Sequence, residues 1–190
     1  MVSQQSFVPA IIVKYGNKIR YNVFATLGGS LVISLLAQIS IPLSFTPVPI
    51  TGQTFGVALI SLLWGRLRGF SAVAIYLAIG FSGFPVFAFG KSGFSFGPTC
   101  GYLLGMLMVA YLMGTLADRG WTESFWKTWM AAFCGSCVTF LVGVLVLSLF
   151  IPKESLLTAG VLPFIPGDLI KTLLVCFIVR QVARKKENER

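Results

Sequence analysis

The sequence predicts an all-α integral membrane protein, folded as a compact bundle of six transmembrane helices. Its composition is too apolar for an ordinary soluble domain, because 56% of the 190 residues are hydrophobic and only 11% are charged. The apolar residues cluster in stretches that approach the roughly 20 residues needed to cross a bilayer. Basic residues fall in alternate loops between these stretches, as expected for a multi-pass protein. We therefore expect residues 1–190 to form a single membrane domain.

Each predicted span is a mostly apolar stretch that ends in a loop containing charge, proline or glycine. In chain order, the predicted spans are residues 21–41, 51–64, 70–81, 101–117, 128–151 and 166–182. The second and third spans are short. The segment between them contains Gly65, Arg66, Arg68 and Gly69, which predicts a tight turn joining two helices.

The distribution of Lys and Arg predicts the side of the membrane that each loop faces. Basic residues precede the first span, follow the last one, and lie in the loops after the second and fourth spans, whereas the other loops hold only Lys91 and Lys153. Because cytoplasmic loops are enriched in Lys and Arg, both termini are predicted to be cytoplasmic. They form a short N-terminal segment over residues 1–20 and a basic tail over residues 183–190. This arrangement, with contact to anionic membrane lipid, explains the net charge of +9 without a nucleic acid partner.

Several kinds of chemistry lack the residues that they need. The chain has no histidine, the usual general base and the commonest metal ligand, so neither a metal site nor a catalytic group is predicted. Cys134 and Cys137 have C-x-x-C spacing, but they lie inside an apolar span and not in a redox fold. Residues 90–92 (Gly-Lys-Ser) resemble the end of a phosphate-binding loop, but Pro85 stands where its first glycine is required. We therefore predict no enzyme activity and no cofactor.

Two loops predicted on the outer side are apolar instead of polar. Residues 41–54 and 81–99 are rich in proline, glycine and aromatic residues, and Lys91 is their one charged residue. Non-helical backbone at membrane depth is tolerated where it is buried in protein or lines a cavity. We expect both loops to fold back over the outer end of the bundle and to cap a ligand cavity. The alternative is that they lie along the membrane interface.

One charged pair cannot be assigned to a loop or a tail. Asp168 and Lys171 are three residues apart at the start of the last span, so on a helix they share a face. Pro166 suits the first turn of that helix, and a carboxylate there is favoured by the helix dipole. Ionisable groups inside a membrane segment face protein, water or a ligand. The pair therefore indicates either a structural ion pair or a polar clamp for a small amphipathic ligand.

Small residues at helical spacing predict close helix packing. Ala25 and Gly29 are one turn apart in the first span, and Gly97, Gly101 and Gly105 make two such steps at the fourth. Spacing of this kind lets helix backbones approach closely in a membrane. The contact can be within the bundle or with another subunit.

Four segments of the chain together resemble the signature segments of the BioY family. They are residues 46–54 (TPVPITGQT), 83–88 (GFPVFA), 97–103 (GPTCGYL) and 166–171 (PGDLIK). BioY proteins are the biotin-binding S components of energy-coupling factor (ECF) vitamin transporters. The resemblance implies a six-helix bundle with a biotin site near the outer face, under the two apolar loops. It also implies the plasma (inner) membrane of a prokaryote as the location.

The resemblance further implies which side chains contact biotin. Asp168 would accept hydrogen bonds from the ureido N–H groups, and Lys171 would serve either the ureido oxygen or the carboxylate. The secondary candidates are the polar or aromatic residues near the outer loops: Thr51, Gln53, Tyr76, Phe87 and Phe89. For Thr51, Gln53 and Tyr76, hydrogen bonding between helices is the alternative role.

The resemblance implies partners as well. A membrane coupling subunit and two cytoplasmic ATPase subunits would supply the energy, and the Ala25/Gly29 step would dock on the coupling subunit. The alternative is a self-sufficient, proton-coupled biotin carrier in which Asp168 exchanges a proton.

Overall fold

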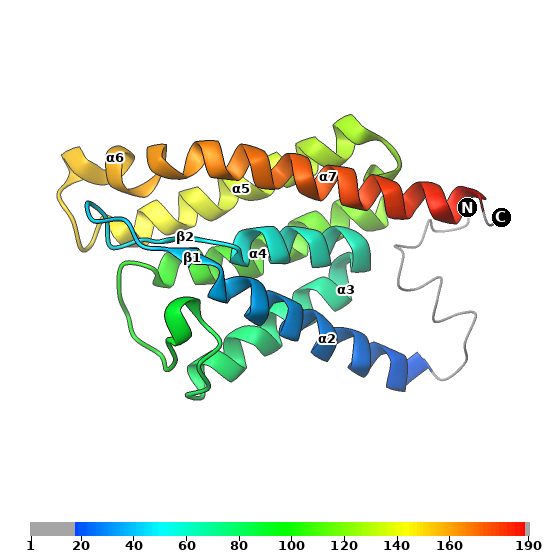
Figure 1. Ribbon diagram of the computed structural model, residues 1–190, viewed down its shortest axis with the longest axis horizontal. Helices are drawn as coiled ribbons and strands as arrows, with labels where there is room; N and C mark the ends of the chain where they lie inside the picture. Colours follow the sequence, from blue (N-terminus) through cyan, green and yellow to red (C-terminus); the bar gives the residue numbers. More distant parts are fainter. Residues whose placement is uncertain (1–17, 189–190) are drawn as a thin grey trace.

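Long α-helices that run roughly side by side make up most of the computed structural model, which describes residues 18–188 (Figure 1). The elements are α2 (Lys18–Gln38), β1 (Ser40–Ile41), β2 (Ile50–Thr51), α3 (Gln53–Phe81), α4 (Cys100–Asp118), α5 (Phe125–Leu147), α6 (Leu156–Gly160) and α7 (Ile165–Asn188). Short 3-10 turns lie at Ala88–Gly90, Trp121–Glu123, Lys153–Ser155 and Leu162–Phe164. Most of the predicted N-terminal segment, including Lys14, and the last two residues of the predicted basic tail lie outside the described residues.

The apolar stretches form helices where the sequence predicts them. One correction concerns the predicted turn between the second and third spans, which is shorter than expected. Only Gly65 leaves the helical conformation, with φ 78° and ψ −177°, while Arg66 to Gly69 are already helical. This backbone conformation is open essentially only to glycine. The chain reverses there, since a Cβ built on Gly69 would lie 2.8 Å from the Cα of Ser61. The two halves of α3 therefore double back on each other (Figure 1).

The described helices have the length and the surface of membrane-spanning segments. Four segments within residues 18–188 are long and apolar enough to cross a bilayer: Gln53–Phe81, Cys100–Asp118, Phe125–Leu147 and Lys153–Lys185. Asn22–Gln38 is apolar but shorter. The faces turned away from the bundle carry large apolar side chains such as Phe24, Leu141 and Phe177, each more than half exposed. An apolar surface of this extent is stable against lipid and not against water.

The bundle core lies around α3 and α4, where small residues let the helices approach. Gly105 of α4 faces the backbone of Thr139 on α5, and Gly114 of α4 faces the backbone of Arg66 at the turn of α3. Gly29 of α2 is buried against the ring of Trp64. Gly29 therefore packs inside this chain, while docking of the Ala25/Gly29 step on a partner stays a prediction. Ala25 is partly exposed.

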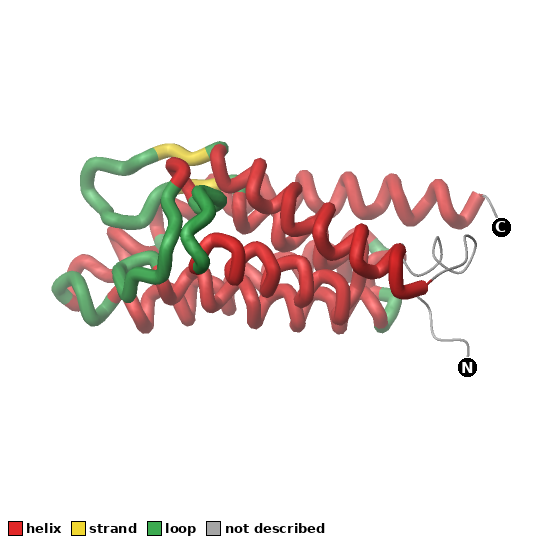
Figure 2. Tube along the Cα trace, turned by 90° about the horizontal axis from the view of Figure 1, so that it is seen from below, coloured by secondary structure: helices red, strands yellow, loops and turns green. Residues whose placement is uncertain are grey.

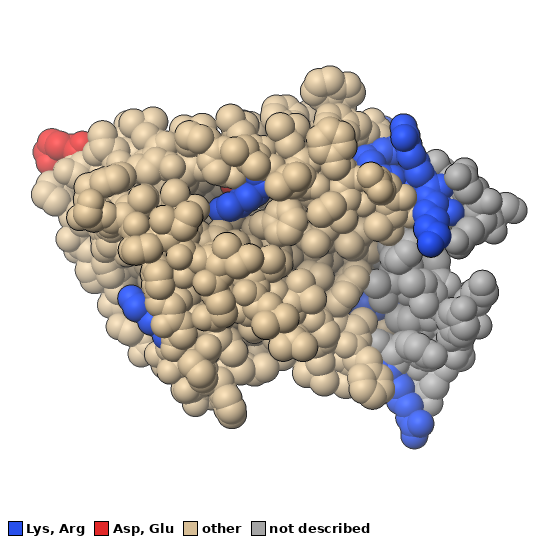
Figure 3. Space-filling view, in the orientation of Figure 1, with Lys and Arg blue, Asp and Glu red and all other residues tan. Residues whose placement is uncertain are grey.

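Loops close one end of the bundle (Figure 2), and most of the Lys and Arg side chains in the view of Figure 3 lie at the other, which we call the basic end. At the loop end, β1 and β2 pair antiparallel, with Ser40 opposite Thr51; neither this pair nor α6 is predicted by the sequence. At the basic end, Arg68 Nε donates to Asn22 Oδ1 of α2 at 2.8 Å, and Arg180 Nη1 of α7 donates to the carbonyl of Thr122 at 3.3 Å.

The apolar loops fold back over the helices, as the sequence predicts. Thr46 and Val48 of the first loop and Phe87 and Ala88 of the second are each less than 10% exposed. Thr46 Oγ1 donates to the carbonyl of Ala159 in α6 at 2.7 Å. Together these segments form a cover over the end of the bundle.

Candidate functional site

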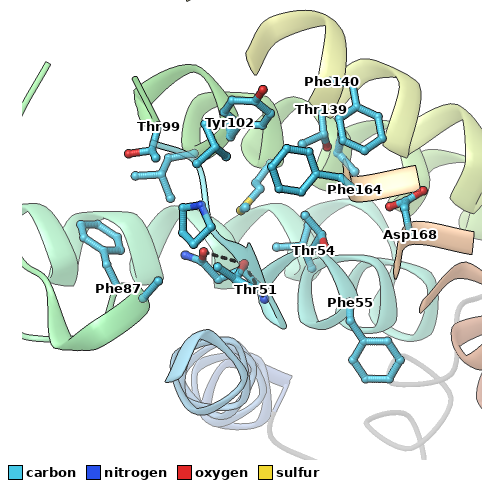
Figure 4. A pocket seen from close by; sticks show the side chains of 18 of the residues that line it. Thr51, Thr54, Phe55, Phe87, Thr99, Tyr102, Thr139, Phe140, Phe164 and Asp168 are labelled. Carbon is cyan, nitrogen blue, oxygen red and sulfur yellow. Dashed lines mark hydrogen bonds between the residues drawn. The ribbon is translucent and has the colours of Figure 1, made fainter. Parts of the chain in front are cut away.

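A cavity of about 360 Å³ lies under this cover, between the loops and the ends of the helices. Residues 42–49 and 87–95 line it from the loops, and α3, α4, α5 and α7 contribute side chains from below (Figure 4). Its size falls within the range of about 300 to 1,000 Å³ typical of small-molecule sites. It is the natural candidate for a ligand site.

The junction between β2 and α3 forms the first polar part of the cavity. Gly52 makes this junction possible, because a Cβ there would lie 2.4 Å from the carbonyl oxygen of Leu36 on α2. The close approach turns Thr51 and Gln53 toward the cavity. Thr51 Oγ1 donates to Gln53 Oε1 at 2.9 Å, and Gln53 Nε2 donates to the hydroxyl of Tyr76. Gln53 is 4% exposed and Tyr76 is fully buried, so buried hydrogen bonds hold both ends of the Gln53 amide.

Lys171 brings a positive charge from α7 to the same junction. Its Nζ donates to the carbonyl oxygen of Thr51 at 2.7 Å and to Thr54 Oγ1 at 3.4 Å. These bonds fasten α7 to the start of α3. A lysine ammonium has three donors, so a third hydrogen bond from Nζ is available to a ligand.

Asp168 lines the cavity one turn before Lys171, in the first turn of α7. Figure 4 places its carboxylate near Phe164 and on the side of the cavity where Thr139 and Phe140 of α5 lie. An ionised carboxylate accepts hydrogen bonds only and can receive two N–H donors at once. Among the described residues, Lys171 directs its hydrogen bonds to Thr51 and Thr54 and not to Asp168. The two charges are therefore not consumed by a direct bond to each other.

Aromatic rings form the apolar walls. Phe87 packs edge-on against Tyr76, with ring centroids 5.5 Å apart, and against Phe81 at 5.4 Å. On the opposite side, Phe164 packs against Tyr102 at 6.5 Å and against Phe140 at 6.3 Å. Apolar walls with a few placed polar groups are the usual construction of a site for a small organic ligand.

The predicted site residues have the following places. Six of them line the cavity: Thr51, Gln53, Phe87, Phe89, Asp168 and Lys171. Tyr76 lies behind Gln53 and acts on the cavity through that side chain. Ala25 and Gly29 are on α2 and do not line the cavity.

Sequence reasoning missed many further lining residues, among them Thr54, Tyr102, Met106, Thr139, Phe140 and Phe164. Phe164 directly precedes the segment that holds Asp168, so its position was a usable signal. The Gly101 and Gly105 steps indicate that α4 packs closely on another helix, but they do not identify α5. Thr139 carries no signal in the sequence, because one threonine in an apolar span is common.

Comparison with known proteins agrees with the resemblance. The sequence model of the BioY family matches residues 14–188. The chain is 38% identical over 157 residues to "Biotin transporter BioY" of Thermotoga maritima, covering 81% of this chain and 90% of that protein. It is 34% identical over 154 residues to "Biotin transporter BioY2" of Lactococcus lactis, covering 77% and 81% respectively. A crystal structure of the S component for biotin from an ECF-type ABC transporter superposes with a TM-score of 0.81 at 30% identity, covering 89% of this chain and 94% of that one.

Proposed function

The chain belongs to the BioY family, and from this premise we propose that it binds biotin in the cavity and carries it across the membrane as the S component of an ECF transporter. It is a transport component of a prokaryotic membrane and not an enzyme. The observation that carries the proposal is the chemistry of one cavity under the loops. An acidic group, a basic group and a fixed amide lie together there among apolar and aromatic walls.

The groups of biotin match those of the cavity. The ureido ring offers two N–H donors and one carbonyl acceptor, and the Asp168 carboxylate is an acceptor suited to the two donors. The remaining donor on Lys171 suits either the ureido oxygen or the valerate carboxylate. The sulfur-containing ring and the aliphatic chain are apolar, as are the walls formed by Phe87 and Phe164. We assign Thr51 and Gln53 to the polar side of the site and Phe89 to its cover.

We also propose the topology that the basic residues predict. Counting the halves of α3 separately, the chain would cross the membrane six times, with both termini in the cytoplasm. The proposal is supported by the collection of Arg and Lys at the basic end (Figure 3). Reagents that label single cysteines from one side only would test it. Labelling of residues 42–49 from the cytoplasm would contradict it.

The partners proposed are a coupling subunit in the membrane and two cytoplasmic ATPase subunits. Since Gly29 packs against Trp64, the surface that α2 offers to a partner is its opposite face, where Phe24, Gly28 and Leu31 lie. Gly28 has no atom within 4 Å of a Cβ built on it, which leaves room for close helix contact. Biotin uptake in cells that lack every ECF ATPase would favour a self-sufficient carrier instead.

The test is biotin binding to the purified, detergent-solubilised protein, compared with Asp168→Asn and Lys171→Met. Hydrogen bonds to charged groups contribute about 1.5 to 3 kcal/mol, so each substitution is expected to weaken binding by about 10- to 150-fold. Lys153→Met and Asp118→Asn are matched controls that change the same charges outside the cavity. Biotin binding that survives both cavity substitutions, or a folded wild-type protein that does not bind biotin, would refute the proposal.

A further inference from the structure

The side chain of Gln38, at the end of α2, holds the second apolar loop at three points. Its Nε2 donates to the carbonyl oxygen of Val86 at 3.3 Å and to that of Phe87 at 3.2 Å. Its Oε1 accepts from the backbone N–H of Gly90 at 3.2 Å. One amide therefore uses both its donor and its acceptor on a segment about fifty residues away in the chain.

These three bonds stand out because residues 85–92 have few other connections. Within residues 18–188, every hydrogen bond that joins 85–92 to a residue outside the loop uses the Gln38 side chain. The other bonds of the segment are local, such as Phe87 N–H to the Lys91 carbonyl at 3.0 Å and Val86 N–H to the Phe84 carbonyl at 2.8 Å. Gln38 thus makes the hydrogen bonds that attach the backbone of this segment to the bundle.

Apolar packing provides the other attachment, through Phe87 and Val86 on the bundle core and the buried side chain of Ala88. Phe87 sits on Gly80 of α3, where a Cβ would lie 2.2 Å from the ring. Beyond it, Phe89 has φ 60° and is 47% exposed while lining the cavity. A positive φ in a bulky residue persists only where the surroundings hold it. Gly83 and Gly93 bracket the segment with positive φ, and each donates its N–H to the Gly80 carbonyl, at 3.2 and 2.7 Å, so they fix the two ends between which the segment can move.

The first apolar loop is fastened differently. Thr46 Oγ1 makes its buried bond to the Ala159 carbonyl and also accepts from the N–H of Val48 at 3.2 Å. The hydroxyl of Tyr102 holds α6 through the carbonyl of Gly160 at 2.8 Å. Buried bonds of this kind are costly to break. The hydrogen bonds that hold residues 85–92 to the bundle are less buried than those that hold the first loop and α6, so they are the easier ones to break.

We propose that Gln38 is a positioning residue that keeps residues 85–92 closed over the cavity and so sets the rates at which the ligand enters and leaves. The inference rests on the proposed function, since it takes biotin as the ligand. Gln38 does not line the cavity. It acts through the carbonyl groups of Val86 and Phe87 and the N–H of Gly90.

This role makes a kinetic prediction that a damaged site would not share. Gln38 stabilises the closed segment equally with and without ligand, so its loss would favour the open form in both states. Association and dissociation would then accelerate by the same factor, and the dissociation constant would stay nearly constant. We expect Gln38→Ala to raise both rate constants about tenfold, which corresponds to about 1.4 kcal/mol, with the dissociation constant within about threefold of wild type.

The experiment measures association and exchange of labelled biotin on the purified full chain. Gln38→Ala and Gln38→Glu, which loses both donors, should both be fast. Ser34→Ala, one turn earlier on α2, should match wild type because Gln38 bonds to the carbonyl of Ser34 and not to its hydroxyl. Unchanged rates in Gln38→Ala, or slower association with weaker affinity, would overturn the inference.

A second readout separates this inference from the assignment of the ligand. Hydrogen exchange of the backbone amides of Phe87, Gly90 and Lys91, measured without any ligand, should accelerate in Gln38→Ala and stay unchanged in Ser34→Ala. If the wild-type protein fails to bind biotin but this acceleration is observed, the proposed ligand is wrong and the role of Gln38 stands. If the exchange rates do not change, the role of Gln38 is refuted whatever the ligand is.

Discussion

Replacing Tyr76 with phenylalanine removes one oxygen atom and tests whether the cavity depends on a residue that does not line it. The hydroxyl of Tyr76 accepts the hydrogen bond from Gln53 Nε2. Tyr76 is fully buried, and its ring packs edge-on against Phe87. Phenylalanine keeps the ring and this packing. The substitution therefore isolates the hydrogen bond from the shape of the cavity wall.

The size of the effect follows from the burial of Gln53. At 4% exposure, its amide cannot replace the lost acceptor with water. A buried donor left without an acceptor costs about 1 to 3 kcal/mol. Without the Tyr76 hydroxyl, the Gln53 amide could rotate, and ligand binding would have to fix it in one orientation again. We expect Tyr76→Phe to weaken biotin binding by about 5- to 150-fold, which is this range of free energy converted to an affinity.

The assay is calorimetric titration of the detergent-solubilised protein with biotin. Tyr111→Phe is the matched control, because Tyr111 is 50% exposed and packs against Phe70, away from the cavity. In a protein that already carries Gln53→Met, adding Tyr76→Phe should weaken biotin binding by less than it does in the wild type, because the two side chains act as one unit. If Tyr76→Phe binds biotin as tightly as wild type, Tyr76 does not hold Gln53 for the ligand and the argument from burial is wrong.

Two further predictions concern helix packing and the cover. Gly114→Ala places a Cβ 2.5 Å from the backbone of Arg66. Because backbone atoms cannot rotate away, we expect the free energy of unfolding, measured by thermal unfolding, to fall by about 1 to 3 kcal/mol. Gly28→Ala is the control, since Gly28 has open space around it, and it should cause no loss of stability. Tyr102→Phe removes the bond to the Gly160 carbonyl, so the melting temperature should fall by about 2 to 4 °C, and an unchanged value would show that this bond does not hold α6.

Much of the fold follows from patterns that act along the chain. Apolar runs of sufficient length must form helices in a membrane, because every backbone group needs a partner. That requirement, with the segment from Gly65 to Gly69 as a break, predicts six spans; the described residues form five long helices, one of which, α3, turns at Gly65. The bounds differ by a few residues in both directions: α7 continues past the predicted span to Asn188, whereas α2 ends at Gln38 and α5 at Leu147, short of the predicted ends.

What the sequence does not predict is which helices meet. Lys171 is expected near Asp168 because three residues separate them, yet its hydrogen bonds go to Thr51 and Thr54, more than one hundred residues away. The Ala25/Gly29 step predicts a close contact but not its partner, and Gly29 packs against Trp64 of the same chain. Which helices meet depends on the packing of the whole bundle. The spacing of residues within one helix indicates that a contact is close but does not identify the partner helix.

The junction from Thr51 to Gln53 shows how these separate contacts become one site. Gly52 donates its N–H to the Ile39 carbonyl at 2.8 Å, which joins the junction to the end of α2, while the Thr51 carbonyl joins it to Lys171 on α7. Gln38 is the neighbour of Ile39, and it holds the loop over the cavity. A ligand that uses the third donor of Lys171 would leave the bond to Thr51, and with it the link to α2, in place. Thr51 is therefore the residue through which α7, the end of α2 and the polar side of the cavity are joined.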